Sequence, residues 1–182
     1  MRKIILYVAA SLDGYMADGQ KSVNWIKGQD DTAEMQDTFT PFFASVDTVI
    51  MGRTTYEQIV TELSPEKWPY SSAMTYVLTH RPMADAEGIR FTSGNPCQLV
   101  NELRHRAGKD IWICGGADII SQLLKDDLID VFHIATIPVI LGGGVRLFAE
   151  TDGMMNLRLT NTVNYNGIIE TVYERRRDCH AE

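Results

Sequence analysis

The chain has 182 residues, 45% hydrophobic and 23% charged, with a formal net charge of -7 at pH 7. This length suits one domain with a sizeable core, and the acidic balance argues against a nucleic-acid-binding protein. No apolar run is long enough for a membrane span, and three cysteines without metal-ligand spacing are typical of a reducing cytoplasm. We therefore expect one cytoplasmic domain over residues 1–175 and a disordered polar tail at 176–182.

Residues 3–10 predict a first strand, because they form a short apolar run rich in β-forming side chains. Residues 11–24 predict a long loop, a type of segment that often covers a ligand. Its apolar side chains either close over a ligand or pack beneath the loop as a small core. Residues 30–44 then predict a helix, in which Pro41 indicates a kink or an early end.

The first junction between a strand and a glycine follows residues 48–51, which predict a short strand. Gly52, Arg53 and Thr54 come next, and Thr54 with Glu57 three residues later matches a capping box at a helix start. Arg53 lies where an anion would bind. A simple helix cap, with Arg53 in solvent, explains the same pattern.

Residues 75–78 predict another strand, which ends in Thr79, His80 and Arg81. Open α/β sheets bind ligands at the carboxyl ends of their strands, and the forked donors of arginine suit a phosphate. The alternative is an exposed basic turn ended by a proline. A strand at 88–92 and a helix from Asn95 to about Ala107 are expected to follow.

A second strand, glycine and helix junction lies at residues 110–125. The apolar run 111–114 predicts a buried strand, Gly115 and Gly116 follow, and residues 117–124 carry apolar side chains at helical spacing. Glycines let a backbone approach a ligand closely, and a helix start offers free N–H groups to an anion. Taken alone, the pair favours a simple tight turn, because the full G-x-G-x-x-G fingerprint is absent. Two such junctions in one chain favour a shared phosphate-containing ligand.

The last third predicts a strand at 129–137, a loop with three glycines at 138–148, and a closing hairpin that turns at Asn166-Gly167. His133 interrupts the apolar strand and is expected to be structural, while Arg146 is a third candidate to bind an anion. Strands alternate with helices and end in an antiparallel pair. We therefore predict an α/β fold, a three-layer αβα sandwich on a mostly parallel mixed sheet.

Several segments together resemble a known family. Residues 10–15 (ASLDGY), 51–57 (MGRTTYE), 77–79 (VLT) and 114–117 (CGGA) are similar, in order and spacing, to the dihydrofolate reductase-like fold. Residues 11–14, 127–130 and 138–148 resemble more closely the C-terminal reductase domain of bacterial bifunctional riboflavin-biosynthesis proteins. The resemblance extends to about Glu174. It implies an NADPH-dependent reductase, often a homodimer, with a cis peptide between Gly115 and Gly116.

The resemblance also implies where the NADPH would bind, with Gly115 and Gly116 at its pyrophosphate and the segment at residue 80 near its 2′-phosphate. The implied cofactor contacts are Ala10, Gly52, Arg53, Thr54, Thr55, Leu78, Thr79, His80, Arg81, Cys114, Gly115, Gly116, Ala117, Asp118 and Ile119. The implied substrate contacts are Trp25, Phe39 and Arg146. Asp30 and Asp13 are the candidate catalytic carboxylates.

The chain departs from both patterns it resembles. The stretch Leu6-Tyr7-Val8 stands where riboflavin-pathway reductases usually carry a lysine, and the tryptophan context of dihydrofolate reductases is missing around Trp25. We expect an NADPH-dependent reductase of a pyrimidine- or pterin-like heterocycle, most like 5-amino-6-(5-phosphoribosylamino)uracil reductase. Dihydrofolate reductase activity is one alternative, and a non-catalytic NADPH-binding or sensor protein is another. A flavoprotein has less support in the sequence. No nucleic-acid or membrane partner is expected.

Overall fold

The computed structural model describes residues 1–34, 36–149 and 153–176. Its strands are β1 (Ile4–Ser11), β2 (Tyr15–Ala17), β3 (Val46–Gly52), β4 (Met74–Leu78), β5 (Ile89–Thr92), β6 (Asp110–Gly115), β7 (Val131–Ile137), β8 (Val145–Arg146), β9 (Leu157–Tyr165) and β10 (Ile168–Arg175). Its helices are α1 (Phe39–Ala44), α2 (Arg53–Gln58), α3 (Pro96–Arg104) and α4 (Ala117–Lys125). A π-helical turn, η1 (Ile59–Leu63), continues α2.

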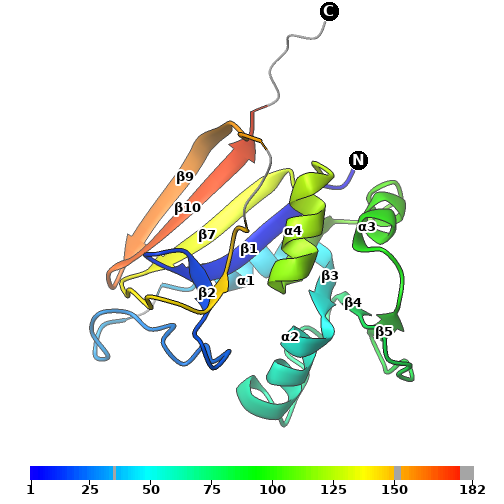
Figure 1. The fold of residues 1–182 in the computed structure, drawn as a ribbon, viewed down its shortest axis with the longest axis horizontal. Coiled ribbons are helices and arrows are strands. Elements are labelled where there is room, and N and C mark those ends of the chain that lie inside the picture. The colour runs from blue at the N-terminus through cyan, green and yellow to red at the C-terminus, as the bar shows by residue number, and fades with distance from the viewer. Residues whose placement is uncertain (35, 150–152, 177–182) are drawn as a thin grey trace, which may run out of the picture.

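Eight strands form the main sheet in the order β5-β4-β3-β6-β1-β7-β10-β9 (Figure 1). The strands from β5 to β7 run parallel, and β10 pairs antiparallel with both β7 and β9. The turn between β9 and β10 has positive φ angles at Asn166 (47°) and Gly167 (76°), as a tight hairpin requires. The predicted mixed sheet with an antiparallel C-terminal hairpin is confirmed.

Helices cover both faces of the central strands, because β1 is apolar on both sides. Ile4, Leu6 and Val8 point toward α3 and α4, while Ile5 and Tyr7 point toward α1 and α2. Figure 1 shows α4 crossing the near side of the sheet and α1 lying behind it. The β9–β10 hairpin has no helix on the near side. The predicted three-layer sandwich is therefore confirmed, with one open half-face.

The helix predicted at residues 30–44 is wrong for most of its length, since only Phe39–Ala44 is helical. Asp30 accepts hydrogen bonds from the backbone N–H and the hydroxyl of Thr32, at 2.8 and 2.7 Å, and this local turn competes with helix formation. Pro41 lies in the first turn of α1, where proline is tolerated, and does not end the helix early. Met35, which falls inside the predicted helix, lies outside the described residues.

Two other expectations need correction. The loop at 11–24 contains β2, which pairs antiparallel with β8 from the glycine-rich loop, so these two loops form a small second sheet. The capping box is absent: α2 begins at Arg53 with Gly52 as its cap, and no side chain caps it. Asn95 does cap α3, accepting from the backbone N–H groups of Cys97 (2.7 Å) and Gln98 (3.2 Å).

The chain's C-terminal end is described as far as Arg176, whose backbone N–H donates to the Asn156 carbonyl at 2.9 Å. The tail predicted to be disordered therefore lies, from residue 177 on, outside the described residues. Within the part of the chain that the structure describes, no helix has the length and apolar character needed to cross a bilayer.

Candidate functional site

The two predicted glycine junctions meet at one edge of the sheet. β3 and β6 are neighbours, and Met51 is paired with Gly115 at their carboxyl ends. A Cβ atom added to Gly52 would lie 3.7 Å from the Gly116 nitrogen, and one added to either Gly115 or Gly116 would lie 3.7 Å from Thr55 Oγ1. The peptide between Gly115 and Gly116 is cis, as the resemblance implied.

The glycines at this edge leave space that protein atoms do not fill. At Gly116 the nearest atom to an added Cβ is Thr55 Oγ1, an ordinary contact, and at Gly52 the nearest is Ile119 Cδ1 at 3.5 Å. Crowding within the protein therefore does not require glycine at either position. Gly115 has a φ of 134°, which side-chain-bearing residues rarely adopt. Such a surface fits the close approach of a ligand backbone such as a pyrophosphate.

The remaining residues expected to contact the cofactor lie at or next to the same edge. They are Ala10 in β1, Leu78 and Thr79 at the end of β4, Cys114 in β6, and Ala117, Asp118 and Ile119 in the first turn of α4. Burial raises the pKa of the Cys114 thiol to about 12, so it is protonated at neutral pH and is a poor nucleophile. The structure thus brings these residues together along the ends of four neighbouring strands.

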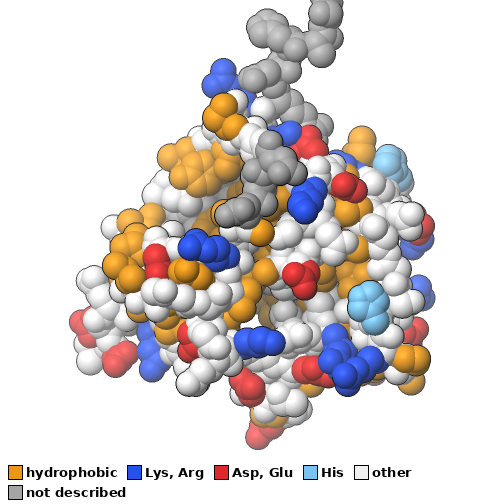
Figure 2. Space-filling view, in the orientation of Figure 1, with side chains coloured by type: hydrophobic (Ala, Val, Ile, Leu, Met, Phe, Trp, Pro, Cys, Tyr) orange, Lys and Arg blue, Asp and Glu red, His pale blue; other side chains and the backbone are white. Residues whose placement is uncertain are grey.

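Cations are present at this edge, and the structure gives them different partners. Arg53 Nη1 donates to Glu57 Oε1 at 2.9 Å, so an incoming anion would compete with this carboxylate. His80 and Arg81 are exposed beyond β4, and Thr54 is exposed in α2. Figure 2 shows Lys and Arg side chains beside Asp and Glu side chains at the lower right, below and beside β4 and β5. The exposed Arg81, together with Arg53 if an anion displaces Glu57, would supply the positive charge that a phosphate needs at this edge.

Asp13 fastens the loop after β1 to the glycine-rich loop after β7. Its carboxylate accepts from Ser11 Oγ (2.7 Å) and from the backbone N–H groups of Leu141 (3.0 Å) and Gly142 (2.7 Å). The Ser11 hydrogen bond is the main reason that the pKa of Asp13 is lowered to about 2. The ionised Asp13 carboxylate thus links the two loops by hydrogen bonds, and this link is called the Asp13 clasp below. The sequence did not indicate this role.

The loop fastened by Asp13 lies over Gly115. Met16 Cε is 3.4 Å from the position that a Cβ on Gly115 would occupy, and Met16 packs against the core cluster on the α4 side. In the same small sheet, the Arg146 guanidinium lies 4.8 Å from the centre of the Tyr15 ring. Arg146 is exposed and lies in β8, which pairs with β2 of the loop over Gly115.

Asp30 is held at the far end of the β9–β10 hairpin. Its backbone N–H donates to Asn166 Oδ1 (2.9 Å), and its carbonyl accepts from Asn166 Nδ2 (2.8 Å). The carboxylate is exposed, and the hydrogen bonds that it accepts from the hydroxyl and the backbone N–H of Thr32 lower its pKa. The structure therefore keeps Asp30 apart from the glycine edge.

The predicted substrate residues fall into separate packing groups. Trp25 packs with Ala9, Ala135 and Ile137 on the α1 side of the sheet. Phe39 stacks on Phe43, with ring centres 5.4 Å apart, and belongs to an aromatic group around Trp112. Arg146, the third predicted substrate residue, lies in β8 of the small sheet formed with β2. The structure therefore does not bring the three predicted substrate residues together, and their contact with a substrate remains a prediction.

A buried carboxylate that the sequence reasoning missed lies between these two groups. Glu170 in β10 is 2% exposed. It accepts hydrogen bonds from Thr38 Oγ1 (2.6 Å), His133 Nε2 (2.8 Å), the Tyr165 hydroxyl and, at 3.4 Å, the Tyr7 hydroxyl. The available signal was alternation: in β10 the same face carries Ile168, Glu170 and Val172, so a glutamate occupies an inward position.

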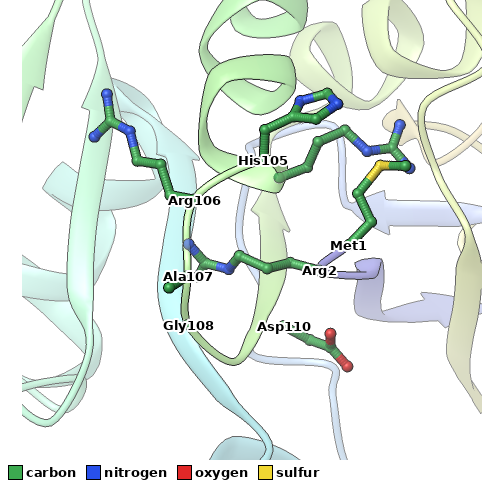
Figure 3. Close-up of a pocket in the computed structure, with 8 residues that line it drawn as sticks. Met1, Arg2, His105, Arg106, Ala107, Gly108 and Asp110 are labelled. Atoms are coloured by element: carbon green, nitrogen blue, oxygen red, sulfur yellow. The ribbon is translucent and has the colours of Figure 1, made fainter.

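A separate cavity of about 430 Å³ lies at the opposite, amino-terminal edge of the sheet (Figure 3). Its lining includes Arg2, Arg104 and Arg106, but Figure 3 shows the Arg106 side chain pointing away from Arg2. Arg2 is ion-paired with Asp47, and Arg104 with Asp130 at 3.3 Å. These cations do not converge on one point, so we assign this cavity no ligand.

Comparisons with known proteins agree with this arrangement. The family model for the RibD C-terminal domain matches residues 2–169. The chain is 36% identical over 175 residues to the uncharacterized protein YwjB of Bacillus subtilis (strain 168), covering 96% of this chain and 98% of that protein. A putative riboflavin biosynthesis protein from Shewanella sp. PV-4 superimposes with a TM-score of 0.82 at 28% identity, covering 96% and 99% of the two chains.

The comparisons also confirm the fold class. A dihydrofolate reductase from Enterococcus faecalis, solved with NADP(H), superimposes with a TM-score of 0.64 at 18% identity, covering 96% of this chain and 97% of that one. At this identity the match shows a shared fold alone.

Proposed function

Because the chain belongs to the RibD C-terminal domain family, we propose that it is an NADPH-dependent reductase of a flat pyrimidine- or pterin-like heterocycle. The observation that carries this proposal is the meeting of two glycine junctions, at Gly52 and at Gly115-Gly116, beside exposed cations. The NADP(H) in the enterococcal reductase of the same fold supports the choice of cofactor. A cytoplasmic setting belongs to the same proposal.

Each part of this edge has a distinct role in the proposal. The backbone at Gly115 and Gly116 and the first turn of α4 would hold the pyrophosphate, and Arg53, His80 and Arg81 would bind phosphate oxygens. The bound cofactor would supply a hydride. The loop held by Asp13 would cover the reacting atoms and exclude water. The chain thus contributes binding and orientation.

Among named substrates we rank the aminouracil ribosyl-phosphate of riboflavin biosynthesis first, with dihydrofolate as the alternative. The matches to the RibD domain and to the Shewanella protein support this order. Arg146, exposed in the covering loop, would meet the ribosyl phosphate.

A second candidate function is a non-catalytic NADPH-binding or sensor protein. Met16, whose Cε approaches Gly115, favours it, because this side chain takes space beside the proposed nicotinamide position. Single-turnover mixing of the NADPH complex with candidate heterocycles separates the two functions. Oxidation of NADPH supports the reductase, and binding without oxidation supports the sensor.

The first test is a titration of the protein with NADPH and NADH, followed by tryptophan fluorescence. We expect NADPH to bind more tightly than NADH, and its affinity to fall roughly tenfold or more in Arg53→Ala, the loss expected for one hydrogen bond to a charged group. Arg106→Ala is the matched control, because this arginine is exposed at the opposite edge and pairs with Glu102 at 3.7 Å. Failure of the wild-type protein to bind either nucleotide would overturn the cofactor assignment.

We also propose a homodimer formed through the open face of the β9–β10 hairpin. Leu157, Leu159 and Ile169 are 39%, 53% and 45% exposed and point to the same side. Figure 2 shows hydrophobic side chains at the surface on the left, over this hairpin. Light scattering should give twice the chain mass, and Leu159→Glu should yield a monomer. A monomeric wild-type protein would contradict this proposal.

A further inference from the structure

Arg53 and Glu57 form an ion pair at the glycine edge, the edge of the sheet where the two glycine junctions meet. Arg53 Nη1 donates to Glu57 Oε1 at 2.9 Å, and the two side chains are 29% and 46% exposed. Arg53 directly follows Gly52. Thr55, two residues further on, has its Oγ1 3.7 Å from the position of a Cβ atom added to Gly116. The pair therefore lies beside the backbone that is proposed to bind the pyrophosphate.

The order of the two charges along α2 does not stabilise this helix. Arg53 is the first residue of α2, Gly52 is the cap, and the first turn holds no acidic residue. The amino-terminal end of a helix favours anions and disfavours cations. A pair spaced four residues apart is likewise more favourable when the glutamate comes before the cation. Both rules are broken here, so the stability of α2 does not account for a cation at this position.

A second pair with the same spacing obeys these rules. Glu102 lies in α3, and Arg106 follows four residues later, past the carboxyl-terminal end of this helix. This pair lies at the opposite edge of the sheet, by the cavity that Arg106 lines. Of the two pairs, the one at the glycine edge has the unfavourable order. An anionic ligand bound there would supply the negative charge that the start of α2 favours.

Neither member of the pair at the glycine edge is held by other side chains. Within residues 1–34, 36–149 and 153–176, the contact between Arg53 and Glu57 is the one hydrogen bond that either side chain makes. A guanidinium has five N–H donors, so most of those on Arg53 are left for a ligand. Exposed ion pairs are weak, and Arg53 can therefore exchange Glu57 for another anion.

A phosphate monoester is a stronger partner for Arg53 than Glu57 is. It carries about −1.5 to −2 charges at pH 7, while a carboxylate carries a single charge, and its oxygens match the forked donors of arginine. The monoester would therefore displace Glu57 and leave this carboxylate unpaired beside a second anion. The free energy of binding is reduced by the ion pair that is lost and by the repulsion that is gained. When the phosphate leaves, Glu57 pairs with Arg53 again.

We infer that Glu57 is a positioning residue that holds Arg53 in the unliganded protein and limits the affinity of the glycine edge for a phosphate monoester. Its return to Arg53 speeds the release of the nucleotide, which a reductase must exchange after each turnover. This inference rests on the proposed function for the identity of the nucleotide. It concerns phosphate binding alone and needs no hydride transfer.

The test measures the release rate and the affinity of NADPH in the wild type and in Glu57→Gln, by stopped-flow tryptophan fluorescence. We expect release to slow and the affinity to rise roughly two- to fivefold in the variant, the range set by one exposed ion pair. Glu62→Gln is the matched control. It removes the same charge further along the helical segment, where Glu62 accepts from Gln58 at 3.5 Å, and it should bind NADPH as the wild type does.

A double-mutant cycle separates an effect through Arg53 from a general effect of charge. In the Arg53→Ala protein, adding Glu57→Gln should have little effect on release or affinity, because the carboxylate then has no cation to hold. Three results would overturn the inference: weaker or unchanged NADPH binding by Glu57→Gln, an equal gain in Glu62→Gln, or an equal gain in the Arg53→Ala background. Weaker binding would show that Glu57 orients Arg53 toward the phosphate instead of withholding it.

Inorganic pyrophosphate distinguishes this inference from the proposed function. Its binding, measured by calorimetry, should also tighten in Glu57→Gln and not in Glu62→Gln. A protein that ignores NADPH and binds pyrophosphate in this way would sink only the proposed function. A wild-type protein that binds neither ligand would overturn both.

Discussion

The glycine edge proposed to bind the cofactor, called the cofactor edge below, and the Glu170 face belong to one sheet and are built in opposite ways. The edge is made by backbone at Gly52, Gly115 and Gly116, where few side chains intrude. The Glu170 face is made by side chains from β1, β7, β9, β10 and the segment before α1, which meet at one buried carboxylate. Each glycine junction of the first region is a local feature of the sequence, and the pairing of β3 with β6 brings the two together. The second exists only when distant segments are packed.

The largest effect should come from removing the carboxylate of the Glu170 face. Glu170→Ala leaves His133, Thr38 and Tyr165 without their acceptor in a buried site, which should cost about 3–5 kcal/mol of unfolding free energy. Glu174→Ala removes an exposed ion pair and should cost about 0–1 kcal/mol. Urea denaturation of both variants makes the comparison. Equal losses would mean that the buried network does not stabilise this face.

The next effect concerns the cover of the cofactor edge. A Cβ on Gly144 would lie 2.1 Å from the Ala17 carbonyl oxygen, and Gly144 has a φ of 134°. Gly144→Ala should therefore force β2 from β8, cost about 1–3 kcal/mol and weaken NADPH binding. Gly143→Ala is the control, since an added Cβ there meets nothing within 4 Å. Thermal unfolding and nucleotide titration of both variants test it, and identical behaviour would contradict the geometry.

A smaller effect separates true helix caps from apparent ones. Asn95 caps α3 by hydrogen bonds, and Asn95→Ala should cost about 1 kcal/mol. Thr54 at the cofactor edge makes no cap, so Thr54→Ala should change the unfolding free energy by less than about 0.5 kcal/mol. Chemical denaturation measures both. A loss at Thr54 as large as at Asn95 would show that side chains stabilise this edge.

The smallest expected effect is local and depends on pH. Asp13→Asn should speed hydrogen exchange at the Leu141 and Gly142 amides with little change in global stability, because Asp13 is at the surface. The pKa of Asp13 is depressed to about 2, so its clasp is fully present above the ordinary pKa of aspartate and is lost as the pH falls through about 2. Protection of these amides that is unchanged in the variant would argue against the clasp.

The difference between local backbone features and contacts between distant segments also explains which parts of the structure could be predicted from the sequence. The glycine junctions and the Asn166-Gly167 turn follow from local backbone preference, so the mixed sheet and the hairpin were predicted correctly. The cofactor contacts at the glycine junctions remain a prediction. The helix at 30–44 was predicted wrongly, because its competitor is a turn at Asp30 that Asn166, 136 residues away, holds in place. β2 and β8 are only three and two residues long and pair across distant loops. Strands this short are not long enough to show the alternation of apolar and polar residues by which a strand is recognised in a sequence.

The Glu170 site escaped prediction for a related reason. His133 was interpreted as a structural residue of an apolar strand, and its hydrogen bond to Glu170 is consistent with that interpretation. The sequence could not show that Thr38, Tyr165 and Glu170 converge, because their contact requires β9 and β10 to be placed against the segment before α1. Alternation in β10 gave the one local sign of an inward glutamate.

The central place of β1 has a consequence for biosynthesis. Its partners are β6 and β7. Ile4 can pair with Ile111, and Ile5 with Val131, only after these later strands have been synthesised. At about 5–20 residues per second, a ribosome would need on the order of ten seconds to reach β7 after making β1. Until β6 and then β7 have been made, the apolar strand β1 lacks its partner strands. The fold therefore has a high contact order, and its first strand is the segment that a chaperone would shield during translation.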